Sequence, residues 1–281
     1  MTRTSLVSQL RADRQLDILK WLRHVRPEDW PGEAMNYAAA KGHLEVVKWL
    51  HASFPELQTT GVIEVTAMCG HLDVIQWFQE HRNEPCEARL MDEAAEKGHL
   101  HAAKWLHANC NEGCTTEAMD RASRNGHLDV VKWLDANRTE GCSTRAMDGA
   151  AGEGHLEVVK WLHENRSEGC TTVAMDSSDG SICEWLHLSR SEGWSWEAMD
   201  NATTRGDIRK LLFLHEHGYN EVTSETFLLA VRCGHLSILK WLHVNYPQHL
   251  NLPELLREAK DLYPQVCAWL TARHQQQDVD M

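Results

Sequence analysis

The hydrophobic and polar positions of the chain repeat at a fixed interval. Residues 126–134 read GHLDVVKWL, and close copies begin at Gly42, Gly70, Gly98, Gly154 and Gly234. One place in each copy holds an aromatic residue, and these residues are 28 apart except for one step of 24: Trp21, Trp49, Trp77, Trp105, Trp133, Trp161, Trp185, Phe213, Trp241 and Trp269. A fixed period of this length is typical of a solenoid of stacked units. The pattern therefore predicts about ten units.

Each unit is predicted to fold as two helices joined by a turn. In one clear unit, Thr115 can cap a first helix by accepting a bond from a backbone N–H. Ala118 and Ala122 then share one apolar face, and Gly126 can end the helix in the left-handed conformation. A second helix is predicted over residues 128–136, and it is apolar on most sides.

The units divide almost the whole chain. We predict one array over residues 1–270, made of a capping unit at 1–30, five units at 31–170, a shortened unit at 171–193, two units at 194–248 and a second capping unit at 249–270. The polar tail at 271–281 is expected to be disordered.

Charge and composition narrow the possible partners. The chain of 281 residues has a formal net charge of −13, which argues against nucleic acid as a ligand and favours a cationic partner surface. No apolar run approaches the roughly 20 residues that a membrane helix needs. The first residues also lack the apolar core of a signal peptide.

The cysteines indicate a reducing compartment. Four of the nine recur once per unit, at Cys86, Cys114, Cys142 and Cys170. Stacked helices lie roughly 10 Å apart, whereas a disulfide needs Cα atoms within about 7 Å. We therefore expect this ladder to be reduced and the protein to be cytoplasmic, with the nucleus as the alternative.

The repeated block resembles a known family. Residues 38–50 read AAAKGHLEVVKWL, and 94–100 and 150–156 read AAEKGHL and AAGEGHL. This run is similar to the centre of the ankyrin repeat, over roughly residues 4–270. The resemblance implies an all-α, ankyrin-type solenoid of helix-turn-helix repeats. The family's Thr-Pro-Leu-His signature reads EAMD at 117–120, and the period is 28 rather than 33 residues, so we expect the β-hairpin fingers to be shortened or absent.

The resemblance also implies a concave face, lined by the positions just before Gly-His and by the position after the Thr-Pro-Leu-His place. These positions change from unit to unit while their surroundings stay constant. Such variation favours a specified binding surface over neutral drift on a solvated face. The candidate partner-binding residues are Tyr37, Lys41, Glu93, Glu96, Lys97, Arg121, Arg124, Asn125, Glu153, Asn201, Arg205 and Arg232.

Histidine and tryptophan form ladders of their own. One histidine ladder is His43, His71, His99, His127, His155 and His235, and a second is His51, His107, His163, His187, His215 and His243. Neighbours in a ladder are roughly 10 Å apart, too far to share a zinc ion at 2.0–2.3 Å. We predict that the first ladder makes hydrogen bonds at helix ends and that the tryptophans pack in the core.

A ladder of aspartates allows two interpretations. Its members are Asp92, Asp120, Asp148, Asp176 and Asp200. They can serve the first helical turn, through the helix dipole and local hydrogen bonds. They can also form an acidic stripe that faces a basic partner.

The leading functional hypothesis is a monomeric, non-enzymatic scaffold that binds a partner protein through the inner-helix face. No phosphate loop, nucleophile elbow or His-Glu-x-x-His motif is present, so we expect no catalytic residue, metal or cofactor. An alternative is a substrate adaptor of a ubiquitin ligase, because residues 251–256 read NLPELL and resemble the start of an F-box. The same residues fit a capping unit. An enzyme built around residues 176–183 lacks paired catalytic groups.

Overall fold

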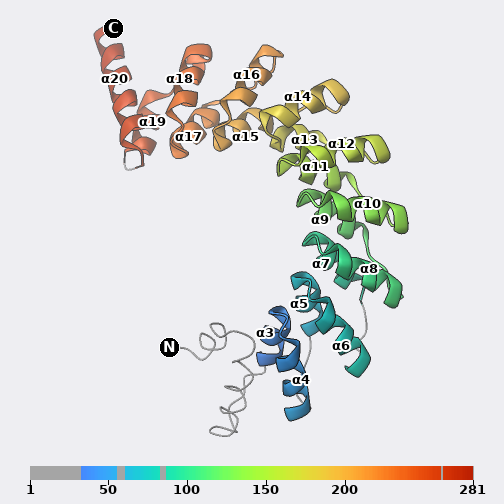
Figure 1. Ribbon diagram of the computed structural model, residues 1–281. Coiled ribbons are helices and arrows are strands. Elements are labelled where there is room, and N and C mark those ends of the chain that lie inside the picture. Colours follow the sequence, from blue (N-terminus) through green and yellow to red (C-terminus); the bar gives the residue numbers. More distant parts are fainter. Residues whose placement is uncertain (1–32, 56–60, 83–86, 261, 281) are drawn as a thin grey trace, which may run out of the picture. The chain divides into compact units, whose positions relative to one another are not determined.

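The computed structural model describes residues 33–55, 61–82, 87–260 and 262–280. Over these residues the protein consists of α-helices and one short 3-10 helix, and it has no strand (Figure 1). The all-α prediction is therefore confirmed, and no β-hairpin finger occurs in this part of the chain. The capping unit predicted at 1–30 lies outside the described residues.

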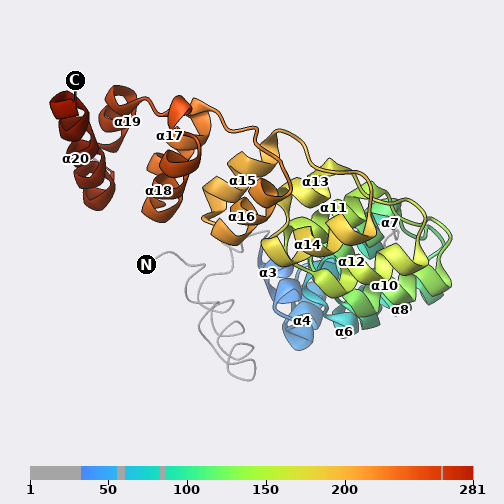
Figure 2. The ribbon, with the colours of Figure 1, turned by 90° about the horizontal axis from the view of Figure 1, so that it is seen from above.

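The chain divides into two compact units, unit 1 (Met1–Ser143) and unit 2 (Thr144–Met281). In both, helices follow one another as pairs, and we name the first helix of each pair the inner helix and the second the outer helix. Each inner helix contacts its own outer helix and the next inner helix of the same unit. Figure 2 shows the pairs of unit 2 from above, with α15 beside α16 and α17 beside α18.

In unit 1 the inner helices are α3 (Ala34–Ala40), α5 (Val62–Cys69), α7 (Ala88–Glu96) and α9 (Thr116–Arg124), and the outer helices are α4 (Leu44–Ser53), α6 (Leu72–Arg82), α8 (Leu100–Asn109) and α10 (Leu128–Asn137). In unit 2 the inner helices are α11 (Thr144–Gly152), α13 (Thr172–Ser177), α15 (Glu197–Arg205), α17 (Ser224–Arg232) and α19 (Leu252–Ala259), and the outer helices are α12 (Leu156–Asn165), α14 (Gly180–Ser189), α16 (Ile208–Glu216), α18 (Leu236–Asn245) and α20 (Pro264–Asp280). The 3-10 helix η1 (Pro247–His249) follows α18.

Local sequence signals set the ends of these helices. The Thr115 side chain accepts a hydrogen bond from the Glu117 backbone N–H at the start of α9, as predicted. Ala118 and Ala122 are buried on one face of this helix. After it, Gly126 adopts φ 78°, the left-handed conformation that stops the helix and turns the chain into α10.

In several repeats the histidine of the Gly-His motif contacts the repeat before it. His71 Nε2 lies 3.1 Å from the carbonyl oxygen of Ala40, and His99 Nε2 lies 2.9 Å from that of Met68. Each ring packs over the preceding repeat's glycine, where a Cβ atom would clash with the ring. The helix-end hydrogen bonds expected of this ladder are therefore present at His71, His99 and His235, and they cross between repeats because these rings face the last turn of the preceding inner helix.

Among the described tryptophans of the ladder Trp77 is buried, at 8% exposed, whereas the others lie at the edge of the core. Val130, Val131 and Leu134 are buried between the helix rows, whereas Trp133 beside them is partly exposed. The ring of Trp133 meets His107 of the preceding repeat edge-on, with centroids 5.4 Å apart. The expectation of full core packing needs this correction, because the aliphatic side chains already fill the space between the helices.

The shortened repeat in unit 2 lacks the end of its inner helix. α13 spans 6 residues, whereas α15 spans 9. Asp179 takes the place of the Gly-His histidine, and its carboxylate caps α14 by accepting from the N–H groups of Ser181 and Ile182. The irregularity expected at 171–193 is thus a shorter helix and a different capping residue.

The C-terminal helix and one cysteine differ from what the sequence indicates. The helix α20 continues to Asp280, so the tail is not disordered from residue 271, because alanine, arginine and glutamine propagate a helix that has already formed. Cys110, which follows α8, forms a disulfide that the ladder argument did not consider because Cys110 is outside the ladder register. Cys114, Cys142 and Cys170 are buried and form no disulfide.

Candidate functional site

The predicted partner-binding residues lie on inner helices or in the turn directly after them. They cluster near the ends of these helices because the glycine of the Gly-His motif terminates each one. Only Glu93 among them is buried. Unit 1 holds Tyr37, Lys41, Glu93, Glu96, Lys97, Arg121, Arg124 and Asn125, and unit 2 holds Glu153, Asn201, Arg205 and Arg232.

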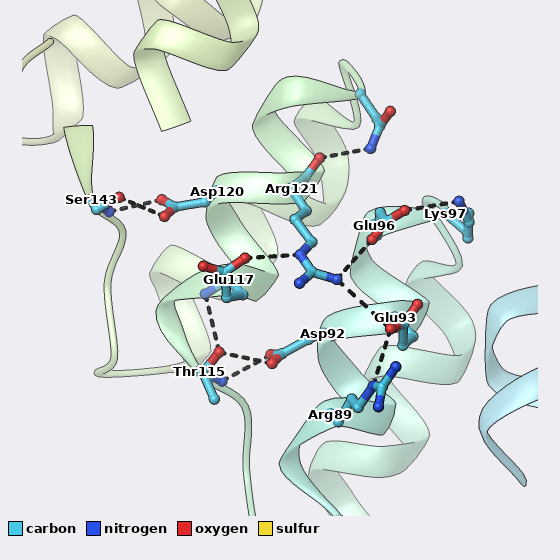
Figure 3. Close-up of polar contacts among 11 residues, drawn as sticks. Arg89, Asp92, Glu93, Glu96, Lys97, Thr115, Glu117, Asp120, Arg121 and Ser143 are labelled. Carbon is cyan, nitrogen blue, oxygen red and sulfur yellow. Dashed lines mark hydrogen bonds and ion pairs between the residues drawn. The ribbon is translucent and has the colours of Figure 1, made fainter. Parts of the chain in front are cut away.

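The largest connected group of these residues surrounds Arg121 (Figure 3). Its Nη1 lies 3.0 Å from Glu96 Oε2 and 3.7 Å from Glu93 Oε1, both on the neighbouring inner helix α7. Its Nε lies 2.9 Å from Oε2 of Glu117, one turn away on α9. The guanidinium therefore contacts three carboxylates and ties two repeats together.

Two further cations complete the group. Arg89 Nε lies 3.4 Å from Glu93 Oε1, and Lys97 Nζ lies 2.9 Å from Glu96 Oε1. Three cations thus face three carboxylates, so the formal charges of the group balance. We call this group the inner-face ion cluster; its members are Arg89, Glu93, Glu96, Lys97, Glu117 and Arg121.

The contacts in the cluster favour the charged forms of its members. The hydrogen bond from Lys97 holds the pKa of Glu96 below its ordinary value, although partial burial opposes this. Glu96 raises the pKa of Lys97, and Glu117 is the main cause that raises the pKa of Arg121. Because the Arg121 side chain is 40% exposed, such pairs contribute little to stability. Their main effect is to fix where the charges stand.

Four other candidates in unit 1 flank the cluster or lie apart from it. Arg124 and Asn125 are exposed, and Asn125 donates a hydrogen bond to the backbone oxygen of Arg121. Lys41 and Tyr37 form a separate pair, with the ammonium 5.8 Å from the ring centroid. They sit on and after α3, and α5 separates that helix from α7 in the row. The structure therefore supports one cluster and one separate pair.

The candidates in unit 2 are not joined into a cluster. Arg232 pairs with Glu258 at 2.7 Å and with Glu225 at 2.9 Å. Arg205 instead donates to backbone carbonyls, those of Gly152 at 3.1 Å and of Ser177. Asn201 is partly exposed and Glu153 is exposed.

The aspartate ladder serves the joints between repeats. Asp120 accepts bonds from the Ser143 N–H at 2.8 Å and from the Ser143 hydroxyl at 2.6 Å, and it is 4% exposed. Asp92 binds Thr115 in the same way, and Asp176 binds Ser195. These carboxylates accept hydrogen bonds inside the fold, which favours a structural role over an acidic stripe that faces a basic partner. The local reading needs correction, because the bonds reach the cap of the next inner helix.

Chemistry beyond binding finds little support in the described part of the chain. No group of three or more histidine, cysteine, aspartate or glutamate side chains there could hold a metal ion. Burial raises the pKa of the Cys114, Cys170 and Cys183 thiols to about 11, which keeps them protonated and unreactive at neutral pH. None of the helices in these residues is long and apolar enough to span a bilayer.

Sequence reasoning missed two residues of unit 2. Lys210 is 1% exposed, and its ammonium donates to the carbonyls of three residues in and after α13: Met175, Asp176 and Ser178. In the repeat register Lys210 occupies the position of the core residue Val130. A lysine at a core position is a signal in the sequence that could have identified it. Trp196 is 62% exposed. It stands where a regular repeat has Thr116, and this difference in residue type could have identified it from the sequence.

The comparison with protein families agrees with this architecture. The family model described as ankyrin repeats (many copies) matches residues 91–134, from within α7 to within α10. These residues contain most of the inner-face ion cluster. The comparison with curated proteins finds no match. Over residues 91–134 the chain is similar to ankyrin repeats, and its all-helical repeats fit that similarity.

Proposed function

We propose that this ankyrin repeat chain is a non-enzymatic scaffold that binds a partner protein through its inner-helix face. Ankyrin repeats generally mediate protein–protein interactions and typically lack enzymatic activity. The finer proposal concerns the surface, which consists of the twelve candidate residues on and directly after the inner helices. The inner-face ion cluster of unit 1 is the part that we expect to contact the partner first.

The cluster supports this proposal because its residues stand at variable positions, while the constant contact between repeats is made by other residues. Arg121 and Glu96 occupy positions that vary between repeats, whereas Asp120 beside them makes the constant joint to the next repeat. The cluster also presents partly exposed charges in fixed places. A partner can bind such groups at low entropic cost, because they are already ordered. Charges arranged in this way give specificity and speed of association more than affinity.

The ubiquitin-ligase adaptor is not proposed. The residues that resemble an F-box lie at the start of α19, where Leu252 and Leu255 are buried in the core of unit 2. They pack as a repeat would, and their apolar side chains are not presented to a second protein.

The proposal predicts that partner binding depends on the inner face and not on charge alone. An inner-face double variant, Lys97→Ala with Arg124→Ala, removes one exposed cation of the cluster and one exposed cation beside it while keeping Arg121. The matched control, Lys104→Ala with Lys132→Ala, removes two exposed cations from outer helices of the same unit. The measurement is affinity capture from source-cell lysate with quantitative mass spectrometry, on full-length chains checked for equal thermal unfolding.

We expect wild type and the control variant to retain the same partner, and the inner-face variant to lose most of it. Each lost charge-assisted hydrogen bond corresponds to about 1.5–3 kcal/mol, which is more than tenfold in affinity. Equal retention by all three chains would exclude the inner face of unit 1 as the binding surface.

A further inference from the structure

Trp196 is a large aromatic side chain that the repeat does not need. It directly precedes α15 and is 62% exposed. Val173, in the first turn of the adjacent inner helix α13, is 48% exposed. Other repeats carry the small hydroxyl residues Thr116, Thr172 and Ser224 at the Trp196 position. An exposed tryptophan in place of a small polar residue costs solubility and brings nothing to the core, so a binding role is its natural explanation.

The backbone that carries Trp196 is held firmly on the side that faces the core. Ser195 donates from its N–H and its hydroxyl to Asp176, at 2.8 and 2.7 Å. The carbonyl oxygen of Ser195 accepts a hydrogen bond from the Tyr219 hydroxyl. The Ser195 hydroxyl oxygen accepts a hydrogen bond from the Glu197 N–H at 3.2 Å. The indole is therefore an exposed ring on an ordered base. Rigid aromatic groups of this kind are the side chains that most often anchor an interface.

The charges around this ring are negative. Glu197 is exposed and makes no ion pair in the described part of the chain. Glu221 is also exposed, and its carboxylate lies 3.4 Å from the same Tyr219 hydroxyl. Burial is the main cause that raises the pKa of Tyr219, and the negative charge of Glu221 raises it further. Two arginines of unit 2 are already paired, Arg190 with Glu192 and Arg232 with Glu225.

We propose that Trp196, Val173 and Glu197 form a docking surface for a partner segment that presents an arginine or lysine side chain. The cation stacks on the indole face and pairs with the Glu197 carboxylate, while the methylene groups of the same side chain cover Val173. A cation over tryptophan is the strongest pairing of its type. The α15 dipole places about half a positive charge at this end, and the full charge of Glu197 outweighs it.

This proposal deepens the proposed function by naming the chemistry of one partner segment, and it concerns unit 2 alone. The net charge of −13 supports it, because long-range attraction favours a basic partner. Arg205, at the far end of α15, does not supply a competing anion site of equal strength, since its Nη1 is used by two backbone carbonyls.

The test uses the indole N–H signal of Trp196 in the full-length protein, assigned with the Trp196→Phe variant by heteronuclear NMR. The probe is a capped tetrapeptide Gly-Arg-Arg-Gly. Its matched control has citrulline in place of both arginines and so keeps the planar group without the charge. We expect the Trp196 signal to shift with the arginine peptide, and the citrulline peptide to bind about three- to fivefold more weakly.

Two protein variants sharpen the test. Glu197→Gln should weaken arginine-peptide binding about two- to fivefold. Glu164→Gln, which removes an exposed charge from the outer helix α12 of the same unit, should leave it unchanged. Equal effects of both variants would reduce the interaction to general charge attraction and overturn the proposal, as would equal binding of the citrulline peptide or no shift at millimolar arginine peptide. None of these results depends on the inner-face variant of unit 1. If the Trp196 signal did not shift but the inner-face variant of unit 1 lost the partner, the proposed function would still hold and only the docking surface would be excluded.

Discussion

The regular repeats of unit 1 and the shortened repeat of unit 2 solve the same problem in different ways. Every inner helix ends with backbone carbonyls that its own hydrogen bonds do not satisfy. In two regular repeats of unit 1 a histidine of the next repeat bonds to one of them, as His71 does for Ala40 and His99 for Met68. At the end of α13 the histidine of the next repeat is replaced by Asp207, which cannot donate when ionised. The carbonyls there accept from two cations of the following repeat, Lys210 and Arg205.

The inner helix of the shortened repeat can lack one turn because another side chain reaches its exposed end. Loss of four residues keeps the faces of the helices in phase, since a turn contains 3.6 residues. It leaves the last turn of α13 open to Lys210, which enters from a core position. A neutral core residue at this position would leave the carbonyls of Asp176 and Ser178 without a donor, whereas that of Met175 also accepts from the Ser178 hydroxyl.

The largest effect is expected at Lys210. The substitution Lys210→Met keeps the length of the side chain and removes the donor, which leaves buried carbonyls unsatisfied. We expect a loss of about 3 kcal/mol in unfolding free energy, measured by denaturant titration, with faster hydrogen exchange confined to α13 and α14. Lys104→Met, at an exposed position in unit 1, should change stability by less than about 0.5 kcal/mol. A similar small change for Lys210→Met would show that water replaces the ammonium.

The contribution of Lys210 to the unfolding free energy is expected to depend on pH. Burial lowers the pKa of Lys210 from its ordinary value of 10.5 to about 8 in the folded chain. Between these values the unfolded chain binds more protons, so the contribution of this group to stability rises with pH, by about 1.4 kcal/mol per pH unit at most. The stability difference between wild type and Lys210→Met should therefore widen from pH 8 to pH 10. The outcome against this account is a difference that stays constant or shrinks over the range.

These two regions also show how far the sequence alone can lead. The predicted helix over 128–136 corresponds to α10, and the cap at Thr115 is present, because such features depend on neighbours in sequence. The contact of Asp120 with Ser143 spans 23 residues, and the reach of Lys210 to Met175 spans 35. Such contacts depend on how the repeats stack, which the spacing of residues does not specify. The same is true of the three carboxylates around Arg121.

Both regions contain hydrogen bonds from an aspartate of one inner helix to the start of the next. Removing such an aspartate should therefore lower the unfolding free energy by the same amount in each region. Asp92→Ala in unit 1 and Asp176→Ala in unit 2 each remove a buried carboxylate that accepts two hydrogen bonds from the next repeat. We expect each to cost about 2 kcal/mol in unfolding free energy, since bonds to charged groups exceed neutral ones. Denaturant titration of the two variants side by side measures this. A much larger loss for Asp176→Ala would show that the shortened repeat depends more heavily on this joint.

The smallest effects are expected where the helix-end donor is exposed to water. His99→Phe keeps a ring over Gly70 and removes the bond to Met68, for an expected loss of about 1 kcal/mol. Arg205→Ala removes the bonds to Gly152 and Ser177, but water can reach these carbonyls once the exposed side chain is gone. Its expected loss is about 0.5 kcal/mol or less. Hydrogen exchange at α5 and α13 measures the two sites separately. If Arg205→Ala opened α13 as much as Lys210→Met does, the two cations would act as one unit, and the division between a buried and a replaceable donor would have to be abandoned.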